Sequence, residues 1–235
     1  LSVDCVVFGF DTKNLRVLLI EREIKQGAEI QKDLKLPGNL VRDNEDMDTA
    51  AHRVLYELTG LDNIYLEQFK VFSDPDRIKN PKDINWLSST TNLPIHRVVT
   101  VAYYSLVKID ESQEKTNGTY RNRWFKIQDI PELPFDHNKI LENAITALRN
   151  TLKTRPIGFE LLPKKFTIRQ LQNLYEVILG TKLDSRNFRK KINKLEYIHP
   201  LNEKQKNVAH KPAQLFYFDK KKYIKKRKDN FGFNM

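Results

Sequence analysis

Short apolar runs separated by polar turns mark the first half of the chain and predict a β-rich domain. These runs predict strands over residues 3–11, 16–23, 63–72, 97–107 and 119–127. The first two runs flank the polar turn Thr12-Lys13-Asn14, so we expect them to form a β-hairpin. Residues 25–34 are mostly polar and predict a loop.

Two segments of this part have apolar residues at helical spacing. The first predicts a helix over residues 47–57 that begins at Asp46 or Asp48 and ends at Gly60. The second helix is expected to begin at Asp136, and its apolar face consists of Ile140, Leu141, Ala144, Ile145 and Leu148. Strands, a helix, more strands and a closing helix together predict an α/β/α sandwich with a mixed sheet.

Residues 73–95 contain Pro75, Pro81 and Pro94 and no clear periodicity, so they predict a long loop. Loops of this length inside a compact domain are often functional or mobile. Trp86 within the loop either covers a ligand or packs onto the sheet.

The pattern changes after residues 154–158, which predict a linker between a domain over residues 1–153 and a second over residues 154–235. Thr167 and Gln170 form a capping box that opens a helix ending at Gly180. Asp184 is expected to cap a second helix over residues 185–195, whose apolar stripe is Phe188, Ile192 and Leu195. Residues 197–201 and 214–219 then predict two strands around a polar turn. Two helices followed by a hairpin predict a winged helix-turn-helix domain.

Composition adds that the chain is a folded protein without a membrane segment. Of its 235 residues 40% are hydrophobic, and no run approaches eighteen apolar residues or resembles a signal peptide. The single cysteine, Cys5, has no partner for an internal disulfide or a metal-binding motif. We therefore expect a cytoplasmic protein with no cofactor.

Charge separates the two predicted domains. Residues 1–155 hold 22 Lys and Arg against 23 Asp and Glu, whereas residues 156–235 hold 19 against 7, a net charge of +12. Such an asymmetry favours a nucleic-acid-binding second domain, with a merely solubilising surface as the alternative. The basic tail, residues 220–228, either adds charge that seeks phosphates or is disordered.

The second helix of the basic domain has the features of a recognition helix. An apolar stripe can dock it, arginine and asparagine near its N-terminal end can reach base edges, and lysines can contact phosphates. The predicted contacts with double-stranded DNA, including two residues of the hairpin, are Arg186, Asn187, Arg189, Lys190, Lys191, Lys194, His210 and Lys211. RNA is a weaker alternative, because few aromatic residues accompany the basic helix for base stacking.

Residues 36–61, LPGNLVRDNEDMDTAAHRVLYELTGL, resemble the Nudix box in spacing. That pattern is glycine, five residues, glutamate, seven residues and R-E-U-x-E-E-x-G-U, in which U is a bulky aliphatic residue. Asn39 stands at the glycine, and the three carboxylate positions of the helix are Val54, Glu57 and Leu58. Mg²⁺ needs oxygen ligands, which two aliphatic side chains do not supply. We therefore expect the scaffold to be kept and the metal site and catalysis to be lost.

Several segments make the resemblance more specific: LPFDHNKIL, the stretch from PIGFELLPKK to SRNFRKKI, and AHKPAQLFYF. They resemble the Nudix-related transcriptional regulators, bacterial repressors or activators that join a Nudix-fold sensor to a C-terminal winged helix and act as dimers. The resemblance implies a ligand-responsive, homodimeric regulator that binds operator DNA. In that family some members bind ADP-ribose-type ligands, while a branch in Bacteroidetes responds to L-arabinose.

A pocket without magnesium lacks the main anchor for a pyrophosphate, whereas a neutral sugar needs only hydrogen bonds and a stacking surface. The sequence therefore favours a pentose such as L-arabinose as effector, with ADP-ribose or a related NAD metabolite as the alternative. Candidate ligand contacts are Lys35, Arg53 and Glu57, although Arg53 can instead hold the box loop by hydrogen bonds. A Mg²⁺-dependent Nudix hydrolase with a nucleic-acid-binding appendage is the other function considered.

Overall fold

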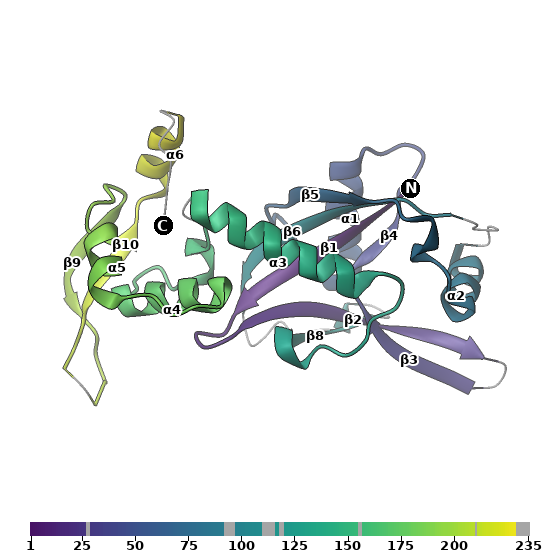
Figure 1. Ribbon diagram of the computed structural model, residues 1–235, viewed down its shortest axis with the longest axis horizontal. Coiled ribbons are helices and arrows are strands. Elements are labelled where there is room, and N and C mark those ends of the chain that lie inside the picture. Colours follow the sequence, from purple (N-terminus) through teal and green to yellow (C-terminus); the bar gives the residue numbers. More distant parts are fainter. Residues whose placement is uncertain are drawn as a thin grey trace. The chain divides into compact units, whose positions relative to one another are not determined.

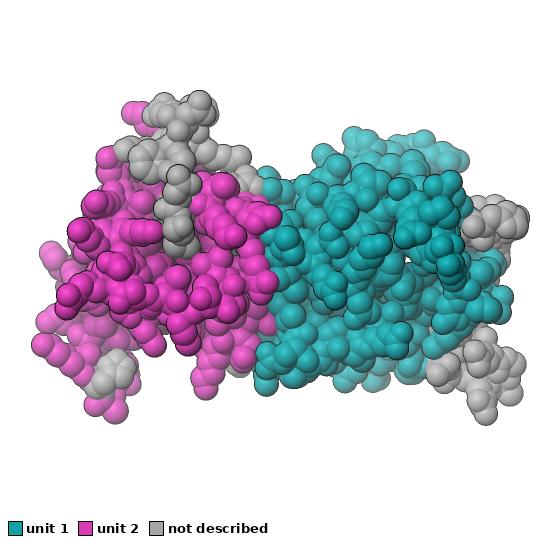
Figure 2. All heavy atoms as spheres, viewed as in Figure 1, with its two compact units in different colours: residues 1–9, 16–147 teal, residues 10–15, 148–235 magenta. Residues whose placement is uncertain are grey.

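The structure is a computed structural model that describes residues 1–26, 29–91, 97–109, 116–117, 120–154, 157–209 and 211–228. The chain forms two compact units, which are residues 1–9 with 16–147 and residues 10–15 with 148–235 (Figures 1 and 2). The predicted boundary between residues 153 and 154 falls at the end of helix α3, His137–Thr154, and it stays a prediction. In the described ranges, no helix is both long and apolar enough to cross a membrane.

The first unit is built on a mixed sheet with the strand order β5-β6-β1-β2-β8-β7, to which β3 and β4 add by pairing with β2 and β1. The strands are β1 Ser2–Phe10, β2 Leu15–Gln26, β3 Glu29–Lys35, β4 Gly38–Leu40, β5 Glu67–Phe72, β6 Thr100–Lys108, β7 Thr116–Asn117 and β8 Tyr120–Lys126. Every residue of the central strand β1 is buried, as expected for a strand covered on both faces.

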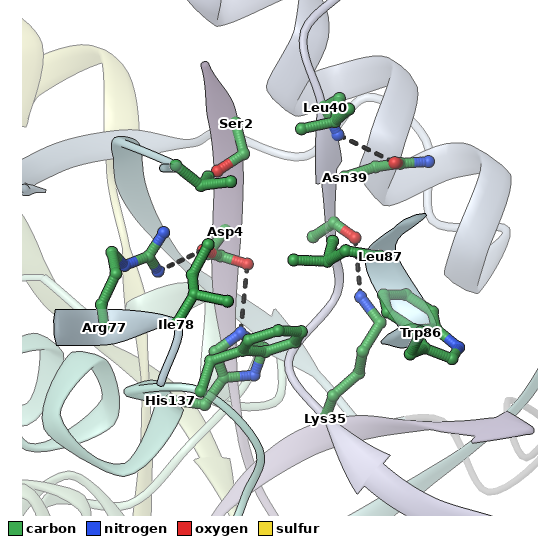
Figure 3. Close-up of a pocket in the computed structure, with 13 residues that line it drawn as sticks. Ser2, Asp4, Lys35, Asn39, Leu40, Arg77, Ile78, Trp86, Leu87 and His137 are labelled. Atoms are coloured by element: carbon green, nitrogen blue, oxygen red, sulfur yellow. Dashed lines mark hydrogen bonds and ion pairs between the residues drawn. The ribbon is translucent and has the colours of Figure 1, made fainter. Parts of the chain in front are cut away.

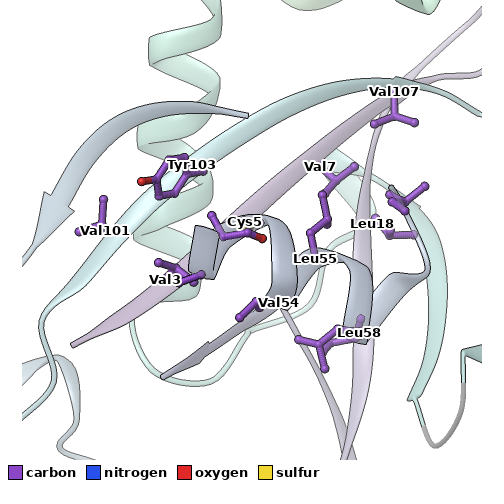
Figure 4. Packing of buried hydrophobic residues seen from close by; sticks show 14 of the residues in the cluster. Val3, Cys5, Val7, Leu18, Val54, Leu55, Leu58, Val101, Tyr103 and Val107 are labelled. Atoms are coloured by element: carbon purple, nitrogen blue, oxygen red, sulfur yellow. Dashed lines mark hydrogen bonds between the residues drawn. The ribbon is translucent and has the colours of Figure 1, made fainter. Parts of the chain in front are cut away.

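Helices α1, Met47–Thr59, and α3 lie on opposite faces of this sheet (Figure 1). As predicted, α1 begins after Asp46, whose side chain accepts from the Thr49 amide, and ends at Gly60 in the left-handed conformation. Its apolar face packs with alternate residues of β1 into one core (Figure 4), which includes Val3, Cys5, Val7, Ala50, Ala51, Val54, Leu55 and Leu58. The predicted α/β fold of this unit is confirmed.

Two predictions made for connecting segments are wrong. The polar stretch 25–34 predicts a loop, but most of it belongs to β2 and β3, which pair in register from Ile20 with Lys35 to Gln26 with Glu29. The stretch 73–95 predicts a long loop, but it holds the short 3-10 helix η1, Pro75–Arg77, and helix α2, Pro81–Thr91. Proline at the first position of each helix is compatible with helix initiation, because that position needs no amide donor.

The second unit is a winged helix domain. It consists of α4 Ile168–Leu179, α5 Ser185–Ile192, β9 Ile198–Lys204, β10 Gln214–Phe218 and α6 Lys220–Lys228, preceded by the 3-10 helix η4 Phe159–Leu161. The capping box of Thr167 and Gln170, the αL residue Gly180 and the Asp184 cap are all present as predicted. Phe188 and Ile192 of α5 are buried, and β9 pairs with β10 in an antiparallel hairpin.

Candidate functional sites

A pocket in the first unit opens where the start of β1, the β3–β4 turn, α2 and the start of α3 meet (Figure 3). Charged and aromatic side chains share its wall. The lining residues are Ser2, Asp4, Lys35, Gly38, Asn39, Leu40, Arg77, Ile78, Trp86, Leu87, Val98, Phe135 and His137. A mixture of apolar surface and a few convergent polar groups is typical of small-molecule sites.

Asp4 lies at the polar end of this pocket, between two basic side chains (Figure 3). Its Oδ2 accepts a hydrogen bond of 2.8 Å from Thr100 Oγ1 and lies 3.5 Å from Arg77 Nη2, while Oδ1 lies 3.5 Å from His137 Nε2. The Leu36 amide donates to His137 Nδ1 at 3.1 Å, which leaves Nε2 to carry the proton that faces Asp4. Burial alone would raise the pKa of the Asp4 carboxyl, but His137, Arg77 and Lys35 outweigh it and hold that pKa well below its usual range.

Gly38 is required for this arrangement because the Asp4 carboxylate occupies the space beside its Cα. A Cβ at position 38 would lie 1.9 Å from Asp4 Oδ1, far inside contact distance. The two residues face each other as a pair in the β1–β4 ladder, so the sheet register itself brings the carboxylate against the β3–β4 turn.

Lys35 supplies a buried cation at the other side of the pocket. Its Nζ donates to the Gly38 carbonyl oxygen at 2.7 Å and lies 5.4 Å from the centroid of the Trp86 ring. Burial lowers the pKa of this ammonium group to about 8, although nearby Asp4 opposes the shift. The sequence predicted Lys35 as a ligand contact, and the structure places it in the pocket wall.

Arg22 packs against the two aromatic residues of the pocket wall, Trp86 and Phe135. The Arg22 guanidinium lies 5.0 Å from the centroid of the Trp86 ring and 5.1 Å from that of Phe135. Its own position is fixed by hydrogen bonds to Asp33 at 2.5 and 2.9 Å and to Asp83 at 2.6 Å. Trp86 therefore packs against the sheet and also forms part of the pocket, so the two alternatives drawn from the sequence are compatible.

Arg53 and Glu57, the other predicted ligand contacts, do not line this pocket. Arg53 donates to both carboxylate oxygens of Glu45, to Glu57 Oε2 at 2.9 Å and to the Leu40 carbonyl at 3.1 Å. These bonds hold the pKa of Glu45 low, at about 2. Arg53 thus ties the loop before α1 to the helix, which is the structural role that the sequence left open.

The Nudix family implies a magnesium site on α1, and the side chains of this helix do not fit one. Val54 is 0% and Leu58 is 4% exposed, and both belong to the core beneath the helix. Glu57 keeps the one carboxylate of the three positions, and Arg53 and Arg42 both donate to it, the latter at 3.0 Å. Two aliphatic side chains and one carboxylate engaged by arginines offer a hard cation few oxygen ligands.

The sequence did not single out Asp4, Arg77 or His137, which come from three distant segments. No local spacing connects them, because β1, η1 and α3 bring them together only in the fold. One signal was present: Asp4 is the acidic residue of a mostly apolar strand, and a buried carboxylate needs partners.

A second candidate site is the exposed surface of α5 in the winged helix domain. The side chains of Arg186, Asn187, Arg189, Lys190 and Lys191 are exposed, as is that of Lys194 just beyond the helix. Phe188 and Ile192 are buried, and the ring centroids of Phe188 and of Tyr175 in α4 lie 5.6 Å apart in a T-shaped arrangement. Two of the three predicted stripe residues are therefore buried in α5. The helix ends at Ile192 rather than at residue 195, so the third, Leu195, lies beyond it and is only partly buried.

A buried polar pair on α4 fixes the turn that leads into α5. Gln172 Nε2 donates to Glu176 Oε1 at 2.8 Å, to the Leu183 carbonyl at 2.9 Å and to Ser185 Oγ at 3.0 Å. Glu176 Oε1 also accepts from the Leu183 amide at 3.1 Å. Hydrogen bonds that connect α4 to the first residue of α5 hold the exposed basic surface in a defined direction.

The hairpin of β9 and β10 contributes further exposed cations. Lys206 and Lys211 are exposed on the turn between the strands, and Lys204 is exposed at the end of β9. His210, which the sequence also predicted as a DNA contact, lies outside the described residues. The contacts of these residues with DNA stay predictions.

Comparison with known proteins identifies both units. Residues 1–147 match the family described as "NUDIX domain", and residues 158–218 match "NrtR DNA-binding winged helix domain". A protein of Acinetobacter baylyi described as "ADPR responsive transcriptional repressor NtrR" is 30% identical over 223 residues, which cover 93% of this chain and 81% of the relative.

Solved structures share the fold over nearly the whole chain. The crystal structure of Shewanella oneidensis NrtR complexed with a 27mer DNA has a TM-score of 0.71 at 24% identity, covering 93% of each chain. A MutT/nudix family protein from Enterococcus faecalis has a TM-score of 0.61 at 23% identity, covering 92% of this chain and 86% of the other. The two matched domains and the Acinetobacter relative together show that the chain belongs to the family of NrtR-type proteins, which join a NUDIX domain to a C-terminal winged helix domain.

Proposed function

We propose that this protein is a transcriptional repressor that binds operator DNA through α5 and the β9–β10 wing. A nucleotide effector of the ADP-ribose class, bound in the NUDIX domain, sets its affinity for DNA. The observation that carries the proposal is the surface of α5, where arginine, asparagine and lysine side chains are exposed around a buried docking stripe. The Acinetobacter relative supports the same function.

The chemistry of the pocket supports a nucleotide as effector. Lys35 offers a positive group for phosphate oxygens and has no described carboxylate as an ion-pair partner. Arg77 and His137 add positive or hydrogen-bonding groups to the same wall, although Arg77 is also paired with Asp136 at 2.7 Å. Trp86 and Phe135 offer flat apolar surfaces for a base or a ribose ring. A diphosphate bridging the basic groups and a ring against the aromatic wall would use both halves of the pocket.

The preference for L-arabinose over ADP-ribose, which followed from the missing magnesium ligands, has no support in the comparisons. That preference assumed that a pyrophosphate needs a metal as its anchor. Lys35 is a buried cation that can take this part, because charge-assisted hydrogen bonds to phosphate are strong where water is excluded. Arg77 is buried nearby, but its Nε and Nη2 already donate to the Asp136 carboxylate. We therefore propose an effector of the ADP-ribose class rather than L-arabinose.

We further infer that α1 does not support catalysis and that the protein acts as a homodimer on an operator with two half-sites. Val54 and Leu58 in the core support the first inference. If it holds, the protein with Mg²⁺ leaves ADP-ribose intact under conditions in which a Nudix hydrolase consumes it. Steady release of AMP that disappears in Glu57→Gln would revive the hydrolase alternative.

Thermal denaturation with candidate effectors tests the sensing part of the proposal. A ligand that binds only the folded state raises the midpoint, and more so at higher occupancy. We expect ADP-ribose to raise the midpoint and L-arabinose to leave it unchanged. Lys35→Gln should remove most of the shift, whereas Lys108→Gln, an exposed change at the end of β6, should retain it.

Binding to duplex DNA tests the other part. An operator selected from a random-sequence library should bind tightly, with an affinity that falls steeply with salt. Arg186→Ala and Asn187→Ala should each reduce discrimination against single base changes by about 1–3 kcal/mol, while Lys194→Ala should weaken all duplexes alike. Unchanged discrimination in both α5 variants would show that α5 is not the recognition helix.

A further inference from the structure

Helix α6 is a concentrated basic element outside the part of the chain that matches the winged helix family. The match ends at residue 218, and α6 follows over Lys220–Lys228 with the sequence KKKYIKKRK. The side chains of Lys220, Lys221, Lys222 and Lys225 are exposed. Neither the fold of the winged helix domain nor its hydrophobic core requires this concentration of positive charge in α6.

The helix is docked on the winged helix domain rather than being a loose tail. The Tyr223 ring lies 5.3 Å from the Tyr197 ring and 5.5 Å from the Phe218 ring, centroid to centroid. Asp219 caps the helix, since its Oδ1 accepts from the Lys222 amide at 2.9 Å, and its own amide donates to the Tyr197 carbonyl at 2.8 Å. The direction of α6 is therefore set by the hairpin.

The hairpin also sets where α6 stands relative to α5. Phe218, the last residue of β10, pairs with Ile198, which begins β9 a few residues after α5 ends. Helix α6 thus starts at the base of the hairpin, the end at which the chain enters β9 after α5, while the exposed Lys206 and Lys211 lie at the other end, between β9 and β10. Figure 1 shows α5 between α6 and the hairpin tip. In this view, segments rich in lysine therefore lie on both sides of α5.

The charge pattern of α6 calls for an anionic partner. Lys221 and Lys225 stand at i and i+4, and Lys222 and Lys225 at i and i+3, where like charges repel and destabilise a helix. Asp219 is the acidic side chain at its start, and no ion pair of these lysines is present among the described residues. Regularly spaced phosphates would relieve this repulsion, and lysine suits them as a point charge without selecting a base.

We propose that α6 is an additional DNA-contact element, whose lysines bind the phosphate backbone of duplex DNA beside the groove that α5 enters. The inference rests on the proposed function, since it takes the same duplex as partner. Its consequence is specific: α6 adds affinity and salt dependence and leaves sequence discrimination to α5.

The test compares two variants with the same reduction in positive charge. One is Lys220→Gln, Lys221→Gln, Lys222→Gln and Lys225→Gln in α6. The control is Lys70→Gln, Lys79→Gln, Lys108→Gln and Lys139→Gln in the first unit. The probe is a mixed-sequence duplex of about 30 base pairs, titrated over a range of salt concentrations, together with the selected operator and its single-base variants.

Removing one lysine–phosphate interaction lowers the slope of log affinity against log salt by about 0.9. We expect the slope of the α6 variant to fall by about 2–4 and its affinity by at least about tenfold, with unchanged discrimination between operators. The control should retain the wild-type slope. Equal slopes in the two variants would overturn the inference while leaving the proposed function intact. Failure of the wild-type protein to bind any duplex would instead overturn the proposed function.

A third variant separates a docked helix from a merely basic tail. Tyr223→Ala keeps every charge of α6 and removes the ring that lies against Tyr197 and Phe218. If docking aims the lysines at the backbone, this variant should bind duplex about fivefold more weakly, while its thermal midpoint in the absence of DNA should report whether the rest of the domain is still folded. Wild-type affinity in a folded Tyr223→Ala protein would contradict the positioning of α6.

Discussion

Lys35 is a buried lysine whose charge faces a pocket, and this makes effector binding depend on pH. Its pKa is lowered to about 8 by burial and by Arg22, against the opposing charges of Asp4 and Asp33. The diphosphate of an ADP-ribose-type ligand stays fully ionised around this pH, so it binds best while Lys35 is protonated. We expect affinity measured by calorimetry to fall as the pH rises from about 7 to about 9.5, and Lys35→Gln to bind weakly without this dependence.

Lys35 also makes stability depend on pH, but stability rises with pH where the affinity for the effector falls. Because its folded-state pKa lies below the ordinary value of 10.5, the folded protein releases the proton first. Lys35 therefore costs stability below about pH 8, and the cost is relieved as the pH rises towards 10.5. Chemical denaturation of wild type and Lys35→Gln over this window should show the difference between them shrinking with pH. A difference that grows would contradict the burial of a charged Lys35.

Val54 shows why the Nudix box cannot regain its glutamates by simple substitution. Its side chain is fully buried in the core, so Val54→Glu places a carboxylate among apolar side chains of the described residues. We expect a loss of about 3–5 kcal/mol in the free energy of unfolding, measured with urea. His52→Glu, an exposed change on the same helix, should stay within about 0.5 kcal/mol. Equal effects of the two substitutions would show that Val54 does not face the core.

At the scale of elements, the packing of α5 against α4 depends on Glu176 more than on its ion pair. The Glu176 side chain is 5% exposed and accepts from Gln172 and the Leu183 amide, whereas Lys182, its ionic partner at 3.3 Å, is 88% exposed. Burial would raise the pKa of Glu176, but these hydrogen bonds lower it overall, so its contribution to stability is lost at acidic pH.

Glu176→Ala should therefore cost about 1–3 kcal/mol of stability, because it leaves the Leu183 amide without its acceptor. Lys182→Ala should cost less than about 1 kcal/mol, since an exposed ion pair contributes little. Urea denaturation of both variants measures the difference. If Lys182→Ala were the more damaging change, the ion pair rather than the buried hydrogen bonds would hold the turn.

Elements with a clear period or cap could be predicted from the sequence, and those that depend on distant partners could not. Helix α1 and the capped helices α4 and α5 are indicated by apolar spacing together with Asp46, Thr167 and Asp184. Strand β3 is mostly polar and forms by pairing with β2, so no alternation reveals it. Helix α2 has few apolar residues, and Asp83 holds it to Arg22 across 61 positions of the chain.

The candidate sites follow the same division. The surface of α5 is local, since one short helix carries both its buried stripe and its basic residues, and the sequence could therefore predict it. The pocket brings Asp4, Lys35, Arg77 and His137 together from four elements, and of these the sequence predicted only Lys35. Arg53 and Glu57, predicted as ligand contacts because they belong to the box, hydrogen-bond within the box and do not line this pocket, so their contact with a ligand stays a prediction.

At the scale of the whole molecule, the charge of the chain is divided according to the two proposed tasks. The sensing unit has no large excess of either charge, which suits a pocket that selects one metabolite by short-range contacts. The winged helix domain and its α6 extension carry the excess positive charge and should dominate affinity for DNA. Regulation then requires that the effector bind two states of the protein with different affinities.

The central claim is that occupancy of the NUDIX pocket controls DNA binding, and one equilibrium measurement tests it most directly. Fluorescence anisotropy of a labelled operator duplex, titrated with protein at several fixed concentrations of ADP-ribose, gives the coupling between the two ligands. We predict that saturating ADP-ribose changes the Kd for the operator by at least about fivefold, and that operator changes the Kd for ADP-ribose by the same factor. L-Arabinose should have no effect. Tight binding of ADP-ribose that leaves the Kd for DNA unchanged would contradict the claim.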